Sequence, residues 1–395
     1  MKTWEQRKLS DIYASIGNAF VGTATPYYVE SGHFYLESNN IKDGQINHNS
    51  EIFINDEFYE KQKDKWLHTG DMVMVQSGHV GHAAVIPEEL DNSAAHALIM
   101  FRHPKEKIEP YFLNYQYQTN KSKKKIEEIT TGNTIKHILA SDMQEFVVDI
   151  TNYDEQKKIG SYFQKLDHLI TLHQRKCEET KSLKKYMLQK MFPENGNCVP
   201  KIRFSGFADA WEQRKWIDVV DISTEMVNPT TGEYDNMPHI APGNIESFTG
   251  RILDNVKTVK EEQLISGKFR FRPDDVVYGK INPQLGKYFY ATVNGLTSAD
   301  AYVFNGKNGL KQKFLFALLQ TSDFFKYSVS VSKRSGMPKI NRDELNAYSF
   351  LMPSEEEQDR IGSYLLQLDH LITLHQHKCD ELQKLKKFML QNMFV

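Results

Sequence analysis

The sequence predicts an α+β protein with a pseudo-twofold internal repeat, in which two mixed α/β domains are separated by an antiparallel pair of long coiled-coil helices. Three observations predict this fold class. A run of 38 residues that begins at Glu155 returns at Glu357, and 26 of the 38 positions are identical. Both copies carry a heptad pattern, and the segment WEQRK occurs at Trp4 and again at Trp211. A repeat of this length usually signals an internally symmetric architecture.

Each copy of the repeat is predicted to be one long helix. Its apolar or small positions are spaced alternately by four and three residues, as in the seam of a coiled coil, and neither copy contains proline. Such a helix extends roughly 55 Å, so it needs an equally long partner, which the other copy can supply. The predicted helix-pair seam consists of Ile159, Phe163, Leu166, Ile170, His173, Cys177, Ile361, Leu365, Leu368, Ile372, His375 and Cys379.

The order of the segments is circular. WEQRK follows the first long helix at Trp211, whereas the segment that would follow the second helix stands near the other end of the chain, at Trp4. We therefore expect the two ends of the chain to lie close together. We also expect one globular domain at each end of the helix pair.

The repeat divides the chain into five parts. We expect a first domain at 1–154, a central helix at 155–192, a linker at 193–210, a second domain at 211–356 and a last helix at 357–395. The linker is rich in proline and glycine, which is typical of a turn. In the first domain, residues 111–125 look helical, and β-branched and aromatic runs predict strands at His33–Ser38, Glu51–Asn55 and Met72–Gln76.

Composition limits the function classes. The 395 residues carry a formal net charge of −2, so contacts with nucleic acid must come from local patches. Three cysteines do not make a disulfide framework and fit a reducing cytoplasm. No stretch approaches 18 apolar residues and no hydrophobic signal region begins the chain, so we expect a cytoplasmic protein without a membrane segment.

Several motifs together resemble a known family. They are WEQRKL at Trp4, GDMV at Gly70–Val73, the pattern EQ..IG..L..LD.LI..H..K in both long helices, and in the second half SGMPKINRDEL at Ser335–Leu345 followed by PSEEEQDRI. Over nearly the entire chain, this arrangement resembles the DNA specificity (S) subunit of type I restriction-modification enzymes. The first half departs from the pattern at Thr151, where the second copy has Pro353, which affects only the local turn.

The resemblance implies a non-catalytic DNA-binding subunit. Each domain would be a target-recognition domain that reads one half of a split, asymmetric site, and the long helices would set the separation of the halves. The helices would also hold two adenine methyltransferase (modification) subunits, and motor-nuclease (restriction) subunits would join the assembly. This chain would bind no cofactor, while its partners would use S-adenosylmethionine, ATP and magnesium.

The sequence agrees with the absence of catalysis. An amino-methyltransferase needs an Asp/Asn/Ser-Pro-Pro-aromatic loop, but Asn282–Leu285 and Thr25–Tyr28 both lack the second proline. A nucleotide-driven motor needs a phosphate-binding loop, and Ser266–Phe269 has the wrong residue after its lysine. Binding is therefore the positive prediction.

Candidate DNA-binding residues lie in loops that follow predicted strands. Arg, Lys, Asn and Gln side chains match base edges, and basic or hydroxyl groups match phosphates. The lysines of 121–125 are weaker candidates, because charge runs at helix ends are usually solvated. The candidates are Gln76, Ser77, His79, His82, Thr131, Asn133 and Lys136 in the first domain, and Lys280, Asn282, Gln284, Lys287, Lys333, Arg334 and Ser335 in the second.

Two alternatives remain open from the sequence. A coiled-coil adapter with two protein-binding heads would show no salt-dependent DNA binding. An independent enzyme could use the His173/Cys177 and His375/Cys379 pairs, because residues four apart share a helix face and two His with two Cys could ligate zinc. Small or polar seam residues also occur where long helices need a fixed register, so we predict no metal site there.

Overall fold

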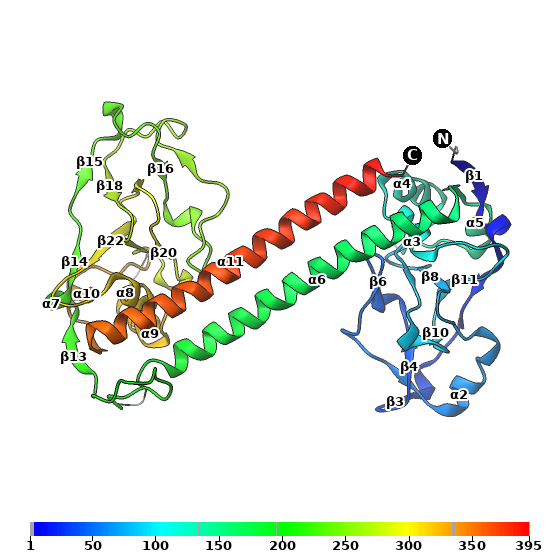
Figure 1. Ribbon diagram of the computed structural model, residues 1–395, viewed down its shortest axis with the longest axis horizontal. Helices are drawn as coiled ribbons and strands as arrows, with labels where there is room; N and C mark the ends of the chain where they lie inside the picture. Colours follow the sequence, from blue (N-terminus) through cyan, green and yellow to red (C-terminus); the bar gives the residue numbers. More distant parts are fainter. Residues whose placement is uncertain (1–3, 133–134, 195, 334–335, 395) are drawn as a thin grey trace. The chain divides into compact units, whose positions relative to one another are not determined.

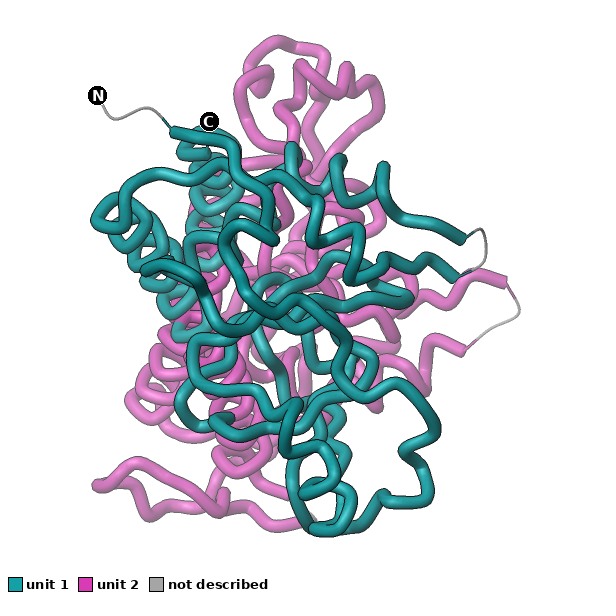
Figure 2. The backbone as a smooth tube through the Cα atoms, turned by 90° about the vertical axis from the view of Figure 1, so that its right-hand side faces the viewer, with its two compact units in different colours: residues 1–172, 379–395 teal, residues 173–378 magenta. Residues whose placement is uncertain are grey.

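The computed structural model describes residues 4–132, 135–194, 196–333 and 336–394. They form two compact units, shown in two colours in Figure 2. Unit 1 comprises residues 1–172 and 379–395, and unit 2 comprises residues 173–378. Each unit contains an α/β domain and a part of both long helices, which are α6 (Tyr153–Lys190) and α11 (Glu355–Asn392) (Figure 1). None of the helices in these ranges has the length and apolarity needed to cross a bilayer.

The domain of unit 1 is built on an antiparallel four-stranded sheet in the order β2–β11–β8–β9. Its strand β8 (Met72–Val75) consists of four apolar residues that are all buried, as expected for a strand covered on both faces. Met72 and Met74 face the core that also contains the long helices, and Val73 and Val75 face a second core. The other strands of this sheet are Tyr13–Asn18 (β2), Leu98–Pro104 (β11) and Ala83–Val85 (β9).

Smaller sheets and short helices complete unit 1. The second four-stranded sheet has the order β10–β4–β7–β3, formed by Ala94–Ala95, His33–Leu36, Phe53–Ile54 and Tyr28–Val29. Two-stranded pairs join β1 (Glu5–Lys8) to β12 (Val147–Ile150) and β5 (Ile41–Lys42) to β6 (Gln45–Ile46). The helices are Leu9–Ile12 (α1), Asp56–Glu60 (α2), Pro110–Tyr117 (α3), Asn120–Ile129 (α4) and Ala140–Glu145 (α5).

The helical stretch expected at 111–125 is two helices, α3 and α4. The side chain of Thr119 accepts a hydrogen bond from the backbone N–H of Ser122, so it acts as the N-cap of α4. The break is therefore a local capping signal inside a stretch that otherwise favours helix. The three segments expected to be strands contain β4, β7 and β8.

Unit 2 repeats the order of elements. Its main sheet has the order β14–β22–β19–β20, formed by Val220–Ile222, Ala301–Gly306, Val276–Gly279 and Tyr288–Tyr290. A five-stranded sheet has the order β15–β18–β21–β16–β17, formed by Met226–Val227, Lys268–Phe271, Gly295–Thr297, Pro238–His239 and Lys257–Thr258. A two-stranded pair joins β13 (Glu212–Lys215) to β23 (Ser349–Met352). The helices are Trp216–Val219 (α7), Gln312–Leu319 (α8), Ser322–Ser332 (α9) and Arg342–Asn346 (α10).

The long helices pack antiparallel within each unit. In unit 1, the Cys379 thiol of α11 approaches the Ile170 carbonyl of α6, and Asp167 of α6 lies 2.6 Å from Lys386 of α11. The residue numbers of the contacts thus decrease along α6 as they increase along α11, as in an antiparallel pair. In unit 2, the Cys177 thiol approaches the Ile372 carbonyl, and Lys184 pairs with Asp369. The predicted antiparallel pair is therefore confirmed. Of the twelve seam residues, ten are buried, and His173 and His375 are half-buried.

Matching clusters of three aromatic rings confirm the circular order of segments. In unit 1, Trp4, Phe112 and Phe394 have ring centroids 5.3–6.0 Å apart, so the first and last described residues meet. In unit 2, the corresponding rings of Trp211, Phe314 and Phe192 lie 5.4–5.8 Å apart. In unit 2, the tryptophan of this cluster follows the end of α6 in the sequence. In unit 1, the tryptophan of the equivalent cluster stands near the beginning of the chain and packs against the end of α11.

Candidate nucleic-acid interface

In unit 1, two of the candidate loops are joined by backbone hydrogen bonds. The N–H of Ile138 donates to the carbonyl of Gln76 at 2.9 Å, and the N–H of Gly78 donates to the carbonyl of Lys136 at 3.1 Å. The loop that follows β8 therefore lies against the loop that precedes α5. We call residues 76–82 with 131–132 and 135–138 the two-loop platform of unit 1.

Unit 2 contains the same arrangement. The N–H of Ile340 donates to the carbonyl of Lys280 at 3.0 Å, and the N–H of Asn282 donates to the carbonyl of Pro338 at 2.8 Å. Residues 280–287 with 333 and 336–340 form the two-loop platform of unit 2. Because the backbone bonds repeat while the side chains differ, the two platforms share a scaffold and present different chemistry.

The platform of unit 1 offers mostly uncharged groups. His79, Thr131 and Lys136 are exposed, whereas Gln76 and Ser77 are half-buried. His79 and Lys136 also line an adjoining hollow of about 410 Å³. These side chains suit hydrogen bonds to base edges more than strong charge attraction.

His82 also lines this hollow. Its ring nitrogen Nδ1 accepts a hydrogen bond from the backbone N–H of Asp43 at 3.2 Å. Burial lowers the pKa of His82, and nearby His79, Lys123 and Lys42 lower it further, while the Asp43 carboxylate opposes them. A neutral imidazole is therefore favoured at this position.

The platform of unit 2 is more basic. The Lys280 ammonium lies 5.0 Å from the centre of the Tyr302 ring, and the Arg342 guanidinium lies 5.8 Å from the same ring. Burial lowers the pKa of Lys280, the positive charges of Lys339 and Arg342 lower it further, and Asp300 opposes them. Two cations thus lie over one aromatic ring, and the charge of Lys339 acts on one of them.

The sequence prediction missed Lys339 and Arg342. A signal for Lys339 existed, because it stands 202 residues after His137 in the repeat and its backbone pairs with Ile281 as that of His137 pairs with Ser77. The guanidinium of Arg342 also donates to the carbonyls of Ile222 and Ser223. Its position therefore depends on contacts that sequence spacing does not reveal.

Other candidates in unit 2 are placed differently. The Lys287 ammonium donates to the backbone carbonyl of Ile245, so it is engaged within the protein. Gln284 is exposed and its amide donates to the Asn282 side chain at 3.3 Å, and Lys333 is exposed at the end of α9. Three candidates, Asn133, Arg334 and Ser335, lie outside the described residues.

The lysine cluster 121–125 makes local contacts. Lys121 forms an ion pair with Asp149 at 2.8 Å, and the Lys125 ammonium donates to the carbonyl of Val147 at 3.2 Å. These bonds hold α4 against β12. They give both lysines a structural role.

Exposed apolar side chains occupy matching positions in the two platforms. Ile135 of unit 1 is 57% exposed, and Met337 of unit 2, which stands 202 residues later, is 65% exposed. Neither was singled out from the sequence, where each reads as an ordinary core residue. Apolar side chains can contact the methyl group of thymine in the major groove.

The His/Cys pairs of the seam do not form a metal centre. The Cys177 thiol is directed at the Ile372 carbonyl and the Cys379 thiol at the Ile170 carbonyl, so the sulfurs contact backbone oxygen. Within the described ranges, no cluster of three or more His, Cys, Asp or Glu side chains is placed to hold a metal ion. His173 and His375 instead approach each other, with 3.0 Å between their Nδ1 atoms.

We expect the His173 contact to weaken in acid. Burial lowers the pKa of His173, and the positive charges of His375, Lys176 and Lys378 lower it further. Below the unfolded-state pKa of about 6.5, the unfolded chain then binds more protons than the folded chain, so stability falls as the pH drops. The midpoint of thermal unfolding of the wild type should fall more steeply between about pH 7 and pH 5.5 than that of His173→Asn.

The exposed His370 on α11 provides the control for this measurement. The pH profile of His370→Asn should follow that of the wild type. Equal slopes for the wild type and His173→Asn would show that the histidine contact is not linked to stability.

Comparison with known proteins gives the family. The model of the type I restriction modification DNA specificity domain matches residues 1–182 and 208–384, one match for each half of the repeat. The specificity subunit of the type I restriction enzyme EcoDI from Escherichia coli is 27% identical over 270 residues, which are 62% of this chain and 60% of that relative. That alignment thus spans less than two-thirds of the relative.

Two further similarities cover nearly all of the chain. The putative specificity subunit MjaX from Methanocaldococcus jannaschii is 23% identical over 408 residues, covering 97% of this chain and 91% of that relative. The crystal structure of the type I restriction-modification S subunit from M. genitalium has the same fold, with a TM-score of 0.68 at 12% identity over 100% of this chain and 96% of that one. The chain therefore belongs to the DNA specificity subunits of type I restriction-modification systems, whose members are non-catalytic.

Proposed function

We propose that each two-loop platform reads one half of a bipartite, asymmetric DNA target. The observation that carries this proposal is the repeated backbone pairing, Ile138 to Gln76 and Ile340 to Lys280, with divergent side chains around it. A shared scaffold gives both halves the same docking geometry. Different side chains give them different base preferences.

The two platforms suit different base edges. Lysine in the major groove pairs best with guanine O6 and N7, so the Lys280 and Lys339 side chains of unit 2 favour a guanine-containing half-site. Glutamine pairs with adenine N6 and N7, so Gln76 of unit 1 favours an adenine. Ile135 and Met337 would add apolar contacts to thymine methyl groups, and exposed Lys136 and Lys333 would meet phosphates.

The exposed faces of the long helices support docking of two copies of one partner. Three pairs of large apolar residues stand at equivalent positions 202 residues apart, and all six are 39–63% exposed. Apolar side chains exposed in a set mark protein interaction sites. In unit 1 they are Leu169, Leu385 and Phe388, and in unit 2 they are Leu371, Leu183 and Tyr186.

We assign these two faces to two adenine methyltransferase subunits. In this proposal the chain directs their methylation, and restriction by motor-nuclease subunits, to the DNA target. The partners use S-adenosylmethionine, ATP and magnesium, and this chain binds none of them. The assembly works in the reducing cytoplasm, which suits the free thiols of the chain.

The test is to purify the chain with its modification subunit and to map the methylated adenines. A bipartite motif is expected. DNA affinity should also fall steeply as salt rises, because cations displace counterions from phosphates. Binding that is insensitive to salt, with no methylation motif, would favour a coiled-coil adapter instead.

Replacing Lys280 should weaken one half of the readout. We expect Lys280→Ala to lower DNA affinity by about 1–3 kcal/mol, or roughly 5–150-fold, and to relax the motif at one position of one half-site. The measurement is a DNA-binding titration combined with methylation mapping. Gln76→Ala is the matched variant, because its backbone occupies the same place in unit 1, and it should relax only the other half-site. Changes in both half-sites from either variant would contradict the division of labour.

A further inference from the structure

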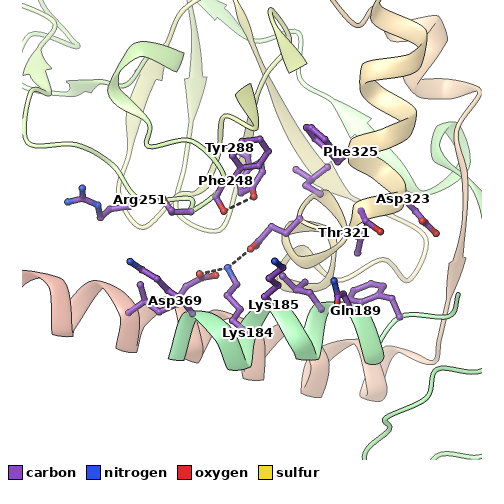
Figure 3. A pocket seen from close by; sticks show the side chains of 18 of the residues that line it. Lys184, Lys185, Gln189, Phe248, Arg251, Tyr288, Thr321, Asp323, Phe325 and Asp369 are labelled. Carbon is purple, nitrogen blue, oxygen red and sulfur yellow. Dashed lines mark hydrogen bonds and ion pairs between the residues drawn. The ribbon is translucent and has the colours of Figure 1, made fainter. Parts of the chain in front are cut away.

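Unit 2 contains a cavity of about 590 Å³ beside the long helices. It lies between the second half of α6, the middle of α11 and the junction of α8 with α9 (Figure 3). This volume is in the range of small-molecule sites. The walls are largely apolar and aromatic, formed among others by Leu188, Phe192, Phe248, Tyr288, Leu319 and Ile372.

A carboxylate with one unused oxygen lines the cavity. The Lys184 ammonium donates to Asp369 Oδ1 and also to the side-chain oxygen of Gln320, as the dashed lines in Figure 3 show. Asp369 Oδ2 is buried and has no hydrogen-bond partner among the described residues. A buried acceptor without a donor is energetically unfavourable. A ligand that donates an N–H or O–H hydrogen bond to this oxygen would therefore be stabilised here.

Unit 1 shows which group completes the same site. Asp167, the repeat equivalent of Asp369, accepts a hydrogen bond from the Tyr115 hydroxyl at Oδ2, at 2.9 Å. Lys386, the equivalent of Lys184, pairs with Asp167 at 2.6 Å, and its ammonium lies 5.2 Å from the centre of the Tyr115 ring. The residue of unit 2 at the same offset of 202 from Tyr115 is Ala317, which supplies no phenol.

Phe248 adds a second, independent sign of a ligand site. Its φ angle is +64°, in the left-handed region that bulky side chains avoid, and its side chain is 52% exposed while it lines the cavity. Its N–H donates to the Gly286 carbonyl at 2.8 Å, and its carbonyl accepts from the Tyr288 hydroxyl at 3.0 Å. Strained residues that surrounding bonds hold in place cluster at ligand sites.

We propose that this cavity binds a hydroxyaryl group, a phenol-type ring whose O–H donates to Asp369 Oδ2. The ring lies under the Lys184 ammonium, as the Tyr115 ring lies under that of Lys386, and packs against Phe248. Two sources share this chemistry: a free hydroxyaryl compound and a tyrosine side chain of a docked partner subunit. Binding by the free chain is independent of DNA reading, so the two proposals fail separately.

The probe is p-cresol, which is the side chain of tyrosine as a free molecule. We expect saturable binding to the purified full-length chain, measured by ligand-observed NMR titration. Toluene, which lacks the hydroxyl, should bind about tenfold more weakly, because a hydrogen bond to a charged acceptor is lost. Equal binding of the two compounds, or no saturable binding of p-cresol, would overturn the proposal.

A pair of equivalent variants locates the site. Thr373 lines the cavity, and Thr373→Trp should fill it and weaken p-cresol binding at least tenfold. Thr171→Trp places the same bulk at the equivalent position of unit 1 and should leave binding unchanged. Wild-type affinity in Thr373→Trp would show that p-cresol binds elsewhere and would refute the assignment.

Repeating the titration on the complex with the modification subunit identifies the source. Loss of p-cresol binding in the complex would show that the partner fills the cavity and supplies the phenol. Retained binding would assign the cavity to a free compound. The titration of the free chain tests whether the hydroxyaryl site exists. The titration of the complex distinguishes only the source of the hydroxyaryl group.

Discussion

Glu357→Ala is expected to destabilise unit 2 by about 3–5 kcal/mol, the cost of leaving one partner of a buried ion pair without the other. The Glu357 side chain is 1% exposed and the Arg203 side chain is 12% exposed. The guanidinium forms a bidentate pair with the carboxylate, with both N–O distances at 2.7 Å. The pair attaches the linker to the first turn of α11. Truncation leaves the guanidinium without its hydrogen-bonded carboxylate, and the charge of Asp209 remains as its other acidic neighbour.

Glu155→Ala is the matched control. Glu155 holds the equivalent place at the start of α6, but its carboxylate contacts only the neutral side chains of Thr151 and Asn152 among the described residues. Interaction with the helix dipole is common to both sites, so the difference between the variants isolates the ion pair. We expect Glu155→Ala to cost about 1 kcal/mol. Denaturant unfolding measures both, and equal losses would contradict a strong Arg203–Glu357 contribution.

Phe163→Ala is expected to destabilise unit 1 by about 3–5 kcal/mol, as for other fully buried aromatic residues that are truncated. Phe163 has no exposed surface, and its ring centre lies 5.0 Å from that of Tyr115 and 6.0 Å from that of Phe394. It therefore joins the beginning of α6, helix α3 and the end of α11. Removing the ring opens a cavity where three distant segments of the chain meet.

Three comparisons define the origin of this loss. Phe163→Leu should cost much less, because Leu365 fills the equivalent buried position in unit 2. A double-mutant cycle of Phe163→Ala with Phe394→Ala should be non-additive, since the two rings share one cluster. Leu169→Ala, on the exposed face of α6, should change stability by no more than about 0.5 kcal/mol. An additive cycle would show that Phe394 packs independently of Phe163.

The duplicated helices were predictable because their pattern is local. Spacing of four and three residues specifies a helix and its apolar seam without knowledge of the rest of the chain. The repeat of WEQRK then predicted that the chain ends meet, and the rings of Trp4 and Phe394 do so with a centroid distance of 6.0 Å. Internal repetition thus carried long-range information that a single copy lacks.

The candidate interface was predictable only as loops. Polar side chains after predicted strands indicated which loops could contact DNA. In the structure, backbone hydrogen bonds join the loop of Gln76 to that of Ile138 and the loop of Lys280 to that of Ile340. Individual roles were not visible in the sequence. Lys287 donates to the Ile245 carbonyl, which lies 42 residues away, whereas the charge of Lys339 lowers the pKa of Lys280. Such contacts depend on how distant loops cross.

The sequence by itself determined the architecture of this protein: the two equivalent halves, the antiparallel helices and the family that these features indicate. The spacing of apolar residues and the internal repeat are properties of the amino-acid sequence, so both can be recognised without a structure. Only the tertiary structure decided which polar groups find partners. Asp167 and Asp369 stand in nearly identical sequences, yet the Tyr115 hydroxyl completes the first and no described group completes Oδ2 of the second. Hydrogen bonding depends on atoms that meet within about 3 Å, and folding alone brings them together.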